Sequence, residues 1–160
     1  MDVRPIRPDE VEAYRDVRLR ALREAPYAFS TTFDEAAARP ESTWREFTHR
    51  LAAREELVGF VLDRGDGRLA GLATVRLEAL SAEVNQMWLD EDLRSQGYAE
   101  ALLAAAEDFA RERGVVSIEL WVEDDNPRAI RVYERCGYQA TGEGEPNLRR
   151  GATLRFTKLL

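Results

Sequence analysis

The stretch that decides the fold runs from Leu93 to Ala106 and reads Leu-Arg-Ser-Gln-Gly-Tyr-Ala-Glu-Ala-Leu-Leu-Ala-Ala-Ala. It follows an expected strand over 83–89 and opens a long amphipathic helix, because apolar residues recur along it at helical spacing. The first N–H groups of a helix lack intrahelical partners and the helix dipole is positive there, so such a start can bind an anion. Gly97, in the turn before the helix, would let backbone approach a ligand without a Cβ in the way. A helix start that merely needs a turn would explain the same residues.

A second pattern follows this helix. An apolar run over 115–122 predicts a strand, and Asn126-Pro127 then predicts a helix start, with a capping side chain before a proline in the first turn. Ala129 stands three residues after the asparagine, Tyr133 stands seven after it, and Gly137-Tyr138 closes the helix. By itself this spacing makes Tyr133 a core side chain on an ordinary apolar stripe.

Together the two patterns resemble the signature of the GNAT superfamily of N-acetyltransferases. The first half of that signature, Arg/Gln-x-x-Gly-x-Gly/Ala on a strand–helix turn, is matched by Arg94-x-x-Gly97-x-Ala99, with Gln96 as the other candidate for the polar position. The second half is matched by the asparagine, alanine, tyrosine and Gly-aromatic pair just described. The close resemblance covers about 83–141, with looser agreement in the order of elements outside that range.

The flanking segments agree with one α/β domain over 1–160. Strands are expected over 3–6, 57–62, 69–77, up to 141 and over 153–159; helices are expected over 9–22, with Asp9 as cap, and over 43–54, with a capping box Thr43-x-x-Glu46. Residues 64–67 predict a hairpin turn, while 24–40 and 142–151 have no sustained period. The resulting order, βααβββαβαββ, matches the GNAT order and implies a mixed, mostly antiparallel sheet flanked by helices.

Composition bounds the class of protein. The 160 residues suffice for a single core, and the 44% hydrophobic and 33% charged content is that of a soluble globular domain. The start of the chain lacks the pattern of a signal peptide, and with one cysteine no intramolecular disulfide can form, so we expect a cytoplasmic protein. The net charge of −7 argues against nucleic acid as a partner and is compatible with a cationic acceptor. No apolar run is long enough for a membrane helix, one histidine and one cysteine make no zinc cluster, and the last strands are a plausible place for two copies to pair.

The resemblance implies acetyl-coenzyme A as cosubstrate, and with one histidine and one cysteine we expect no metal. It assigns the pyrophosphate to the loop formed by Arg94, Ser95, Gln96, Gly97, Tyr98 and Ala99. It assigns the pantetheine arm to the backbone of Met87, Trp88 and Leu89, where the family has a bulge that splays the strand, and to Asn126 and Ala129. The local interpretation leaves the side chains of 87–89 in the core and Asn126 as a plain cap. Arg128, Arg131 and Arg135 would meet the cofactor's phosphates or simply solvate a helix face.

The resemblance also names two catalytic candidates. Tyr133 would be the general acid for the coenzyme A thiolate, a role that a neutral phenol can fill. Glu83 matches the position of the base glutamate in the histone-modifying branch, and a carboxylate is useful because an ammonium of pKa ~10.4 cannot attack. The alternatives for Glu83 are a surface strand carboxylate, with another carboxylate or water as base.

We therefore predict an N-acetyltransferase that transfers acetyl directly to a primary amine. Tyr27, Phe29 and Phe33 would wall the acceptor pocket or only pack under a loop, and acceptor identity is expected in 24–40 and 142–151. Two alternatives are an inactive acyl-coenzyme A sensor, which would not need Tyr133, and an acyltransferase for longer acyl groups.

Overall fold

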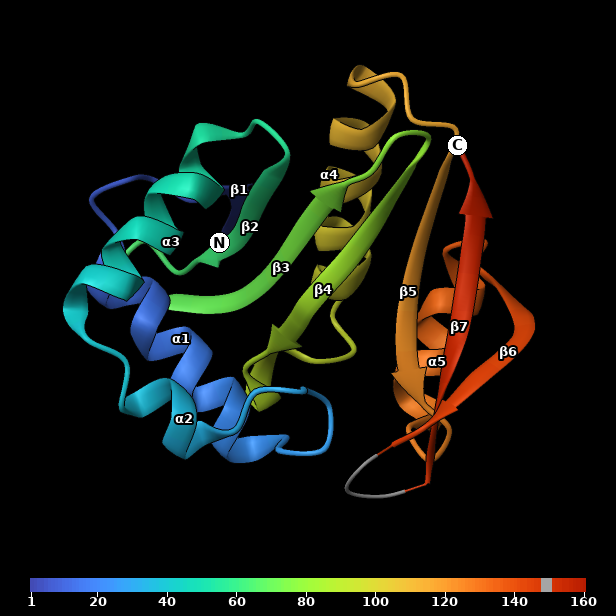
Figure 1. Ribbon diagram of the computed structural model, residues 1–160, viewed down its shortest axis with the longest axis horizontal. Helices are drawn as coiled ribbons and strands as arrows, with labels where there is room; N and C mark the ends of the chain where they lie inside the picture. Colours follow the sequence, from blue (N-terminus) through green and yellow to red (C-terminus); the bar gives the residue numbers. More distant parts are fainter. Residues whose placement is uncertain (148–150) are drawn as a thin grey trace.

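The computed structural model describes residues 1–147 and 151–160. Its elements in chain order are β1 (Asp2–Pro5), α1 (Val11–Glu24), α2 (Phe33–Ala37), α3 (Glu41–Ala53), β2 (Leu57–Asp63), β3 (Leu69–Leu77), β4 (Ser81–Leu89), a 3₁₀ turn (Glu91–Leu93), α4 (Tyr98–Glu112), β5 (Ser117–Glu123), α5 (Pro127–Arg135), β6 (Gln139–Pro146) and β7 (Ala152–Leu159). The mixed α/β architecture with helices around one sheet confirms the predicted fold class (Figure 1).

The strands form one seven-stranded sheet in the order β1-β2-β3-β4-β5-β7-β6. Every neighbouring pair is antiparallel except β4 and β5, which run parallel because α4 carries the chain back between them. This parallel pair matches residues only from Ser81↔Ser117 to Val84↔Leu120. Beyond Val84 the two strands diverge, and the sheet opens into a V between β4 and β5 (Figure 1).

A bulge in β4 accompanies this divergence. In the β3–β4 ladder Thr74 pairs with Asn85 and Leu72 with Trp88, so two β4 residues oppose one β3 residue between these pairs. One of these two β4 residues is Gln86, whose φ of 55° lies in the left-handed region that non-glycine residues seldom adopt. The bulge bends β4 away from β5 close to the residue where their pairing stops.

Two apolar clusters hold the helices on opposite faces of the sheet. One joins α1 and α3 to the sheet through Tyr14, Leu51 and Trp88, and the other joins α4 through Phe109 and its neighbours. The apolar stripe of each helix is what fixes which side it covers. The two layers leave the V between β4 and β5 flanked by α1 and the 25–32 connection on one side and by α5 on the other (Figure 1).

Several boundaries differ from the sequence prediction. The segment 24–40 contains the short helix α2, which the predicted order lacked, and its start carries a true capping box: Glu35 N–H donates to Thr32 Oγ1 at 3.1 Å and Thr32 N–H to Glu35 Oε2 at 2.9 Å. The capping box predicted at Thr43 is wrong, because α3 already begins after Pro40 and Thr43 lies inside it. Similarly, α1 is preceded by Glu10 rather than capped by Asp9.

The strand predicted to end at Thr141 continues to Pro146 as β6. Its pairing with β7 shifts register between Ala140 and Gly144, and Gly142 adopts a φ of +85° there, which glycine tolerates. Gly142 therefore allows an irregular strand in a segment whose sequence has no sustained period. Of the loop predicted over 142–151, residues 148–150 lie outside the described part of the chain.

Candidate active site between strands β4 and β5

The V between β4 and β5 holds two adjoining cavities of about 500 and 520 Å³, a size that suits small-molecule ligands. One lies against the start of α4 and is called the cofactor-side cavity; the other lies against α1, α3 and β3 and is called the acceptor-side cavity. Six residues line both of them: Ala28, Phe29, Met87, Asn126, Ala129 and Tyr133. These shared walls make the two cavities the arms of one channel through the sheet.

The cofactor-side cavity ends at the N-terminus of α4. Gly97 is the residue before the helix, with a φ of 86°, and Ser95 has a φ of 63°. The first bond of the helix runs from Ala101 N–H to the Gly97 carbonyl, so the preceding N–H groups have no intrahelical acceptor. Ser95 and Ala99 line this cavity; Gln96, Gly97 and Tyr98 are not among its lining residues. The start of α4, where backbone N–H groups lack intrahelical acceptors, therefore borders the cavity through Ser95 and Ala99, and such a helix start suits an anion.

Arginines outnumber acids around the same cavity. Four guanidinium groups (Arg94, Arg128, Arg131, Arg135) and two carboxylates (Glu24, Glu100) line it. Arg135 is paired with Glu100 at 2.7 Å. A locally basic cavity in a chain of net charge −7 fits a polyanionic ligand such as the diphosphate of coenzyme A.

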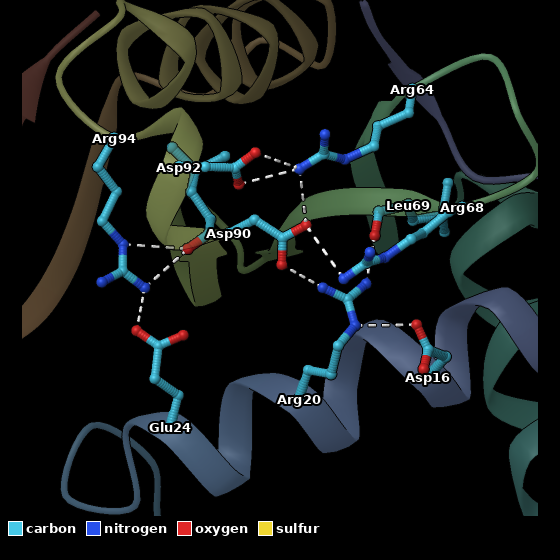
Figure 2. Close-up of polar contacts among 10 residues, drawn as sticks. Asp16, Arg20, Glu24, Arg64, Arg68, Leu69, Asp90, Asp92 and Arg94 are labelled. Carbon is cyan, nitrogen blue, oxygen red and sulfur yellow. Dashed lines mark hydrogen bonds and ion pairs between the residues drawn. The ribbon is translucent and has the colours of Figure 1, made fainter.

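Arg94 is already engaged within the protein. Its Nη2 donates to the Leu89 carbonyl at 2.8 Å and also contacts Glu24 (Figure 2). Leu89 closes β4 and Glu24 closes α1, so Arg94 ties the turn before α4 to both elements. It lines the cavity, but its position is set by these contacts.

Asp90 forms a second set of ion pairs at the end of β4, next to the contacts of Arg94. The Asp90 side chain is 10% exposed, and its carboxylate accepts from Arg20 of α1 and from Arg64 Nη2 at 3.2 Å, with Arg68 at 3.6 Å (Figure 2). Three cations around one buried carboxylate satisfy its charge in a region of low dielectric. The network thus holds α1, the β2–β3 hairpin and the end of β4 in one arrangement beside the channel.

Tyr133 stands where the two arms meet. Its side chain comes from α5, is 8% exposed and packs edge-on against Tyr138 with ring centroids 6.2 Å apart. Among the described residues no hydrogen bond to its hydroxyl is present. Burial, and then the negative charge of Glu123, raise the pKa of Tyr133 well above its usual range, so the phenol stays protonated.

Asn126 and Met87 complete the junction. Asn126 caps α5, since its Oδ1 accepts from Ala129 N–H at 3.2 Å, and this confirms the local interpretation of the residue as a cap. Met87 lies in the part of β4 that no longer pairs with β5. Met87, Trp88 and Leu89 all line the cofactor-side cavity, while Trp88 and Leu89 are also core residues.

The carboxylates divide into two groups. Glu83 pairs with Arg76 at 2.9 Å and is absent from the residues that line either cavity, so its role as base stays a prediction. Glu123, 7% exposed at the end of β5, and Glu56 line the acceptor-side cavity. Glu123 also lies close enough to Tyr133 to act on its pKa.

Of the three aromatic residues predicted to wall the acceptor pocket, only Phe29 lines a cavity. Phe29 lines both arms, whereas Tyr27 is 40% exposed and lines neither. Phe33 begins α2 and packs against Arg23, with the guanidinium carbon 4.6 Å from the ring centroid.

Two polar residues of the acceptor-side cavity were missed in the sequence. Arg18 lies on the buried face of α1 beside Tyr14 and Val17. Its charge within an apolar stripe could have indicated a functional residue, because buried charges are rare. Gln86 carries the left-handed φ of the bulge and gave no such signal, because the bulge depends on pairing with β3.

Within residues 1–147 and 151–160, no group of three or more His, Cys, Asp or Glu side chains is placed to hold a metal ion. No helix of the described chain has the length and apolar character needed to span a bilayer.

Comparison with known proteins identifies the family. The model of the GNAT acetyltransferase family matches residues 18–138, which contain every residue that lines the two cavities except Thr153 of β7. The chain belongs to the GNAT family of acetyltransferases, as predicted. Its signature turn and its Tyr133 lie within the matched region.

Individual relatives agree with this assignment to the family. A mycothiol acetyltransferase of Clavibacter sepedonicus is 30% identical over 131 residues, covering 82% of this chain and 40% of that protein. This chain therefore spans about two fifths of the length of that relative.

Among solved structures, an acetyltransferase of the GNAT family from Streptococcus pneumoniae has a TM-score of 0.85 at 15% identity, covering 99% of this chain and 98% of that one. PaiA N-acetyltransferase of Thermoplasma acidophilum, solved with coenzyme A, has a TM-score of 0.78 at 15% identity over 99% and 98%. At this identity the two structures support the fold.

Proposed function

We propose that this protein transfers the acetyl group of acetyl-coenzyme A directly to a primary amine. The observation that carries the proposal is the single channel through the splayed sheet, with Tyr133 at the junction of a basic arm and an acceptor-side arm. A direct transfer needs both substrates bound at once with the reacting atoms in contact, and two arms that share a wall supply that geometry.

The residues of the basic arm suit the cosubstrate. Backbone donors before α4 and the arginines of α5 would hold its phosphates, and the unpaired edge of β4 beyond Val84 would hydrogen-bond its amide-bearing arm. Acetyl-coenzyme A supplies an activated thioester. A backbone N–H of the same β4 edge would polarise the carbonyl, as an oxyanion hole does.

Tyr133 would donate its hydroxyl proton toward the departing sulfur. Because its pKa is raised, and a thiol titrates near ~8.5, complete proton transfer to a thiolate is uphill. The phenol therefore serves first as a hydrogen-bond donor to the developing negative charge. Its protonation does not change over the neutral range, so Tyr133 should contribute no alkaline decline in rate between about pH 7 and pH 9.

The amine must lose a proton before it attacks. Glu83 is the candidate from the family resemblance, and Glu123, which lines the acceptor-side cavity, is the candidate from geometry. Either carboxylate would act directly or through water.

The test is a panel of primary amines incubated with acetyl-coenzyme A, with release of free thiol as the measurement. The expected result is amine-dependent thiol release and an acetylated product detected by mass spectrometry. Binding of acetyl-coenzyme A without turnover of any amine would favour the sensor alternative. Tighter competition by succinyl- or longer acyl-coenzyme A than by acetyl-coenzyme A would favour a longer acyl donor.

A further inference from the structure

The acceptor-side cavity contains a buried cation that has no ion-pair partner within the described chain. Arg18 of α1 is 5% exposed, lines this cavity, and has a buried Nη1 that makes no hydrogen bond to any described residue. Phe29 packs on the guanidinium, with its ring centroid 4.4 Å from Arg18 Cζ. A cation–π contact offsets some of the lost hydration but accepts no hydrogen bond from Nη1.

The electrostatic surroundings of Arg18 favour an anion. Burial lowers the pKa of Arg18 to about 10, which still leaves it charged at neutral pH, and the nearby positive charge of Arg39 acts in the same direction. The other two arginines of the cavity are paired, Arg50 with Glu56 at 3.0 Å and Arg76 with Glu83 at 2.9 Å. Leaving a buried charged donor unpaired is costly, so proteins seldom retain one without a ligand to meet it.

A second polar side chain, that of Gln86, belongs to the lining of the same cavity. Tyr14 lies one turn before Arg18 on α1, and its hydroxyl donates to Gln86 Oε1 at 2.9 Å. This contact engages the amide oxygen of Gln86. The amide nitrogen makes no hydrogen bond to any described residue, and Gln86 lines the cavity from the bulge of β4.

We propose that the acceptor is an amine that also carries a carboxylate, and that Arg18 and the Gln86 amide bind that carboxylate. A planar anion of charge −1 matches one guanidinium and one amide donor, whereas a phosphate dianion would leave charge uncompensated. The acceptor class is therefore that of amino acids and similar zwitterions, and we expect simple polyamines to be poor acceptors. The inference rests on the proposed acetyl transfer, because it names the substrate of that reaction.

The experiment compares three matched sets of acceptors: free amino acids, the corresponding amino-acid amides, and the corresponding decarboxylated amines. The amides are less basic and the decarboxylated amines more basic than the amino acids, so amine basicity alone cannot favour the carboxylate in both comparisons. Thiol release gives kcat/KM for each acceptor. We expect the best amino acid to exceed its amide and its amine by roughly 10- to 100-fold, the effect of a hydrogen-bonded charge.

The variant Arg18→Met should remove this preference while leaving the KM for acetyl-coenzyme A unchanged. Arg18→Lys should restore part of it, since it keeps the charge without the planar donors. Arg15→Met, an exposed site on the same helix, is the matched control and should behave as wild type. The melting temperature of Arg18→Met should equal or exceed that of wild type, because an unpaired buried charge is lost, and this checks that the variant folds.

Other outcomes overturn the inference. Turnover of amides or decarboxylated amines as good as that of amino acids would refute it while leaving the acetyltransferase function standing. A ratio unchanged in Arg18→Met, or a raised KM for acetyl-coenzyme A in that variant, would also refute it, the latter by assigning Arg18 to the cosubstrate. Failure of all three sets would refute the inference. If the wider panel of primary amines also releases no thiol, the proposed function fails with it.

Discussion

At the scale of single residues, the proposed reaction assigns a role to the hydroxyl group of Tyr133, which lines both cavities. The ring is held by packing against Tyr138, so the hydroxyl can be removed without disturbing the wall. We expect Tyr133→Phe to lower kcat by about 10²–10³-fold, the usual loss when one hydrogen-bond donor to a developing negative charge is removed. Affinity for acetyl-coenzyme A should change by a few-fold at most, because a neutral hydrogen bond contributes only ~0.5–1.5 kcal/mol.

Steady-state kinetics and calorimetry measure these two effects. Tyr138→Phe is the matched control, since Tyr138 lines neither cavity and should retain its rate. A loss confined to binding would make Tyr133 a contact for the cosubstrate. An unchanged rate would remove it from the reaction.

The identity of the base can be resolved at the same scale. If Glu83 accepts the amine proton, Glu83→Gln should lower the rate most at low pH, where nearly all of the amine is charged, and Glu123→Gln should leave the pH profile unshifted. Because Glu83 lines neither cavity but pairs with Arg76, which lines the acceptor-side cavity, the comparison of the two variants is informative in either direction. The measurement is kcat/KM from about pH 6 to pH 9, a range below the ~10.4 reference pKa of an alkylamine. Profiles of Glu83→Gln and wild type that superimpose would leave Glu123 or water as the base.

At the scale of elements, the start of α4 is the proposed anion site. Gly97→Glu places a side chain at a φ of 86° and a negative charge beside the basic cavity. The strained backbone should cost about 1–2 kcal/mol of stability, and the charge should reduce affinity for acetyl-coenzyme A by at least about 10-fold.

Gly67→Glu is a matched control for this prediction. Gly67 has a φ of 85° and, like Gly97, has no described atom within 4 Å of the position that a Cβ would take, but it lies in the β2–β3 hairpin. It should share the loss of stability in urea unfolding and keep full affinity in calorimetry. Equal affinity losses in both variants would show that strain, and not the anion site, is responsible.

At the scale of the whole molecule, ion pairs join segments that are distant in sequence. Arg4 of β1 donates to Glu10 Oε2 at 2.9 Å, just before α1, and to Asp63 at the end of β2. Hydrogen bonding to Arg4 lowers the pKa of Glu10 despite its partial burial. A carboxylate with a lowered folded-state pKa stabilises the fold above its unfolded-state value, ~4.3, and loses that contribution as pH falls through the folded-state value.

We therefore expect Glu10→Gln to lose about 1 kcal/mol of unfolding free energy at pH 7, discounted for partial exposure. Wild type and variant should converge below about pH 4, because the wild-type carboxylate is then increasingly protonated. Urea unfolding from about pH 7 to pH 3 measures this. Glu41→Gln, which removes an exposed pair with Arg45, should follow wild type throughout. A difference that persists undiminished at the acid end of that range would contradict the linkage.

The sequence by itself determined the family, the fold class and most of the elements. Local patterns carry this information: apolar periodicity predicts α4, Asn126-Pro127 predicts the start of α5, and a glycine-containing turn predicts the β2–β3 hairpin. Each of these signals resides in neighbouring residues, so no knowledge of the rest of the chain is needed.

Only the tertiary structure decided how the channel is built. The bulge at Gln86 depends on register with β3, and the opening depends on where the pairing of β4 with β5 stops. Arg18 is distinctive because no carboxylate from another segment of the described chain pairs with it, while Glu83 is engaged because Arg76 reaches it. Ion pairs and cavity walls are formed by segments far apart in the chain, and a local sequence pattern does not predict which segments will come into contact.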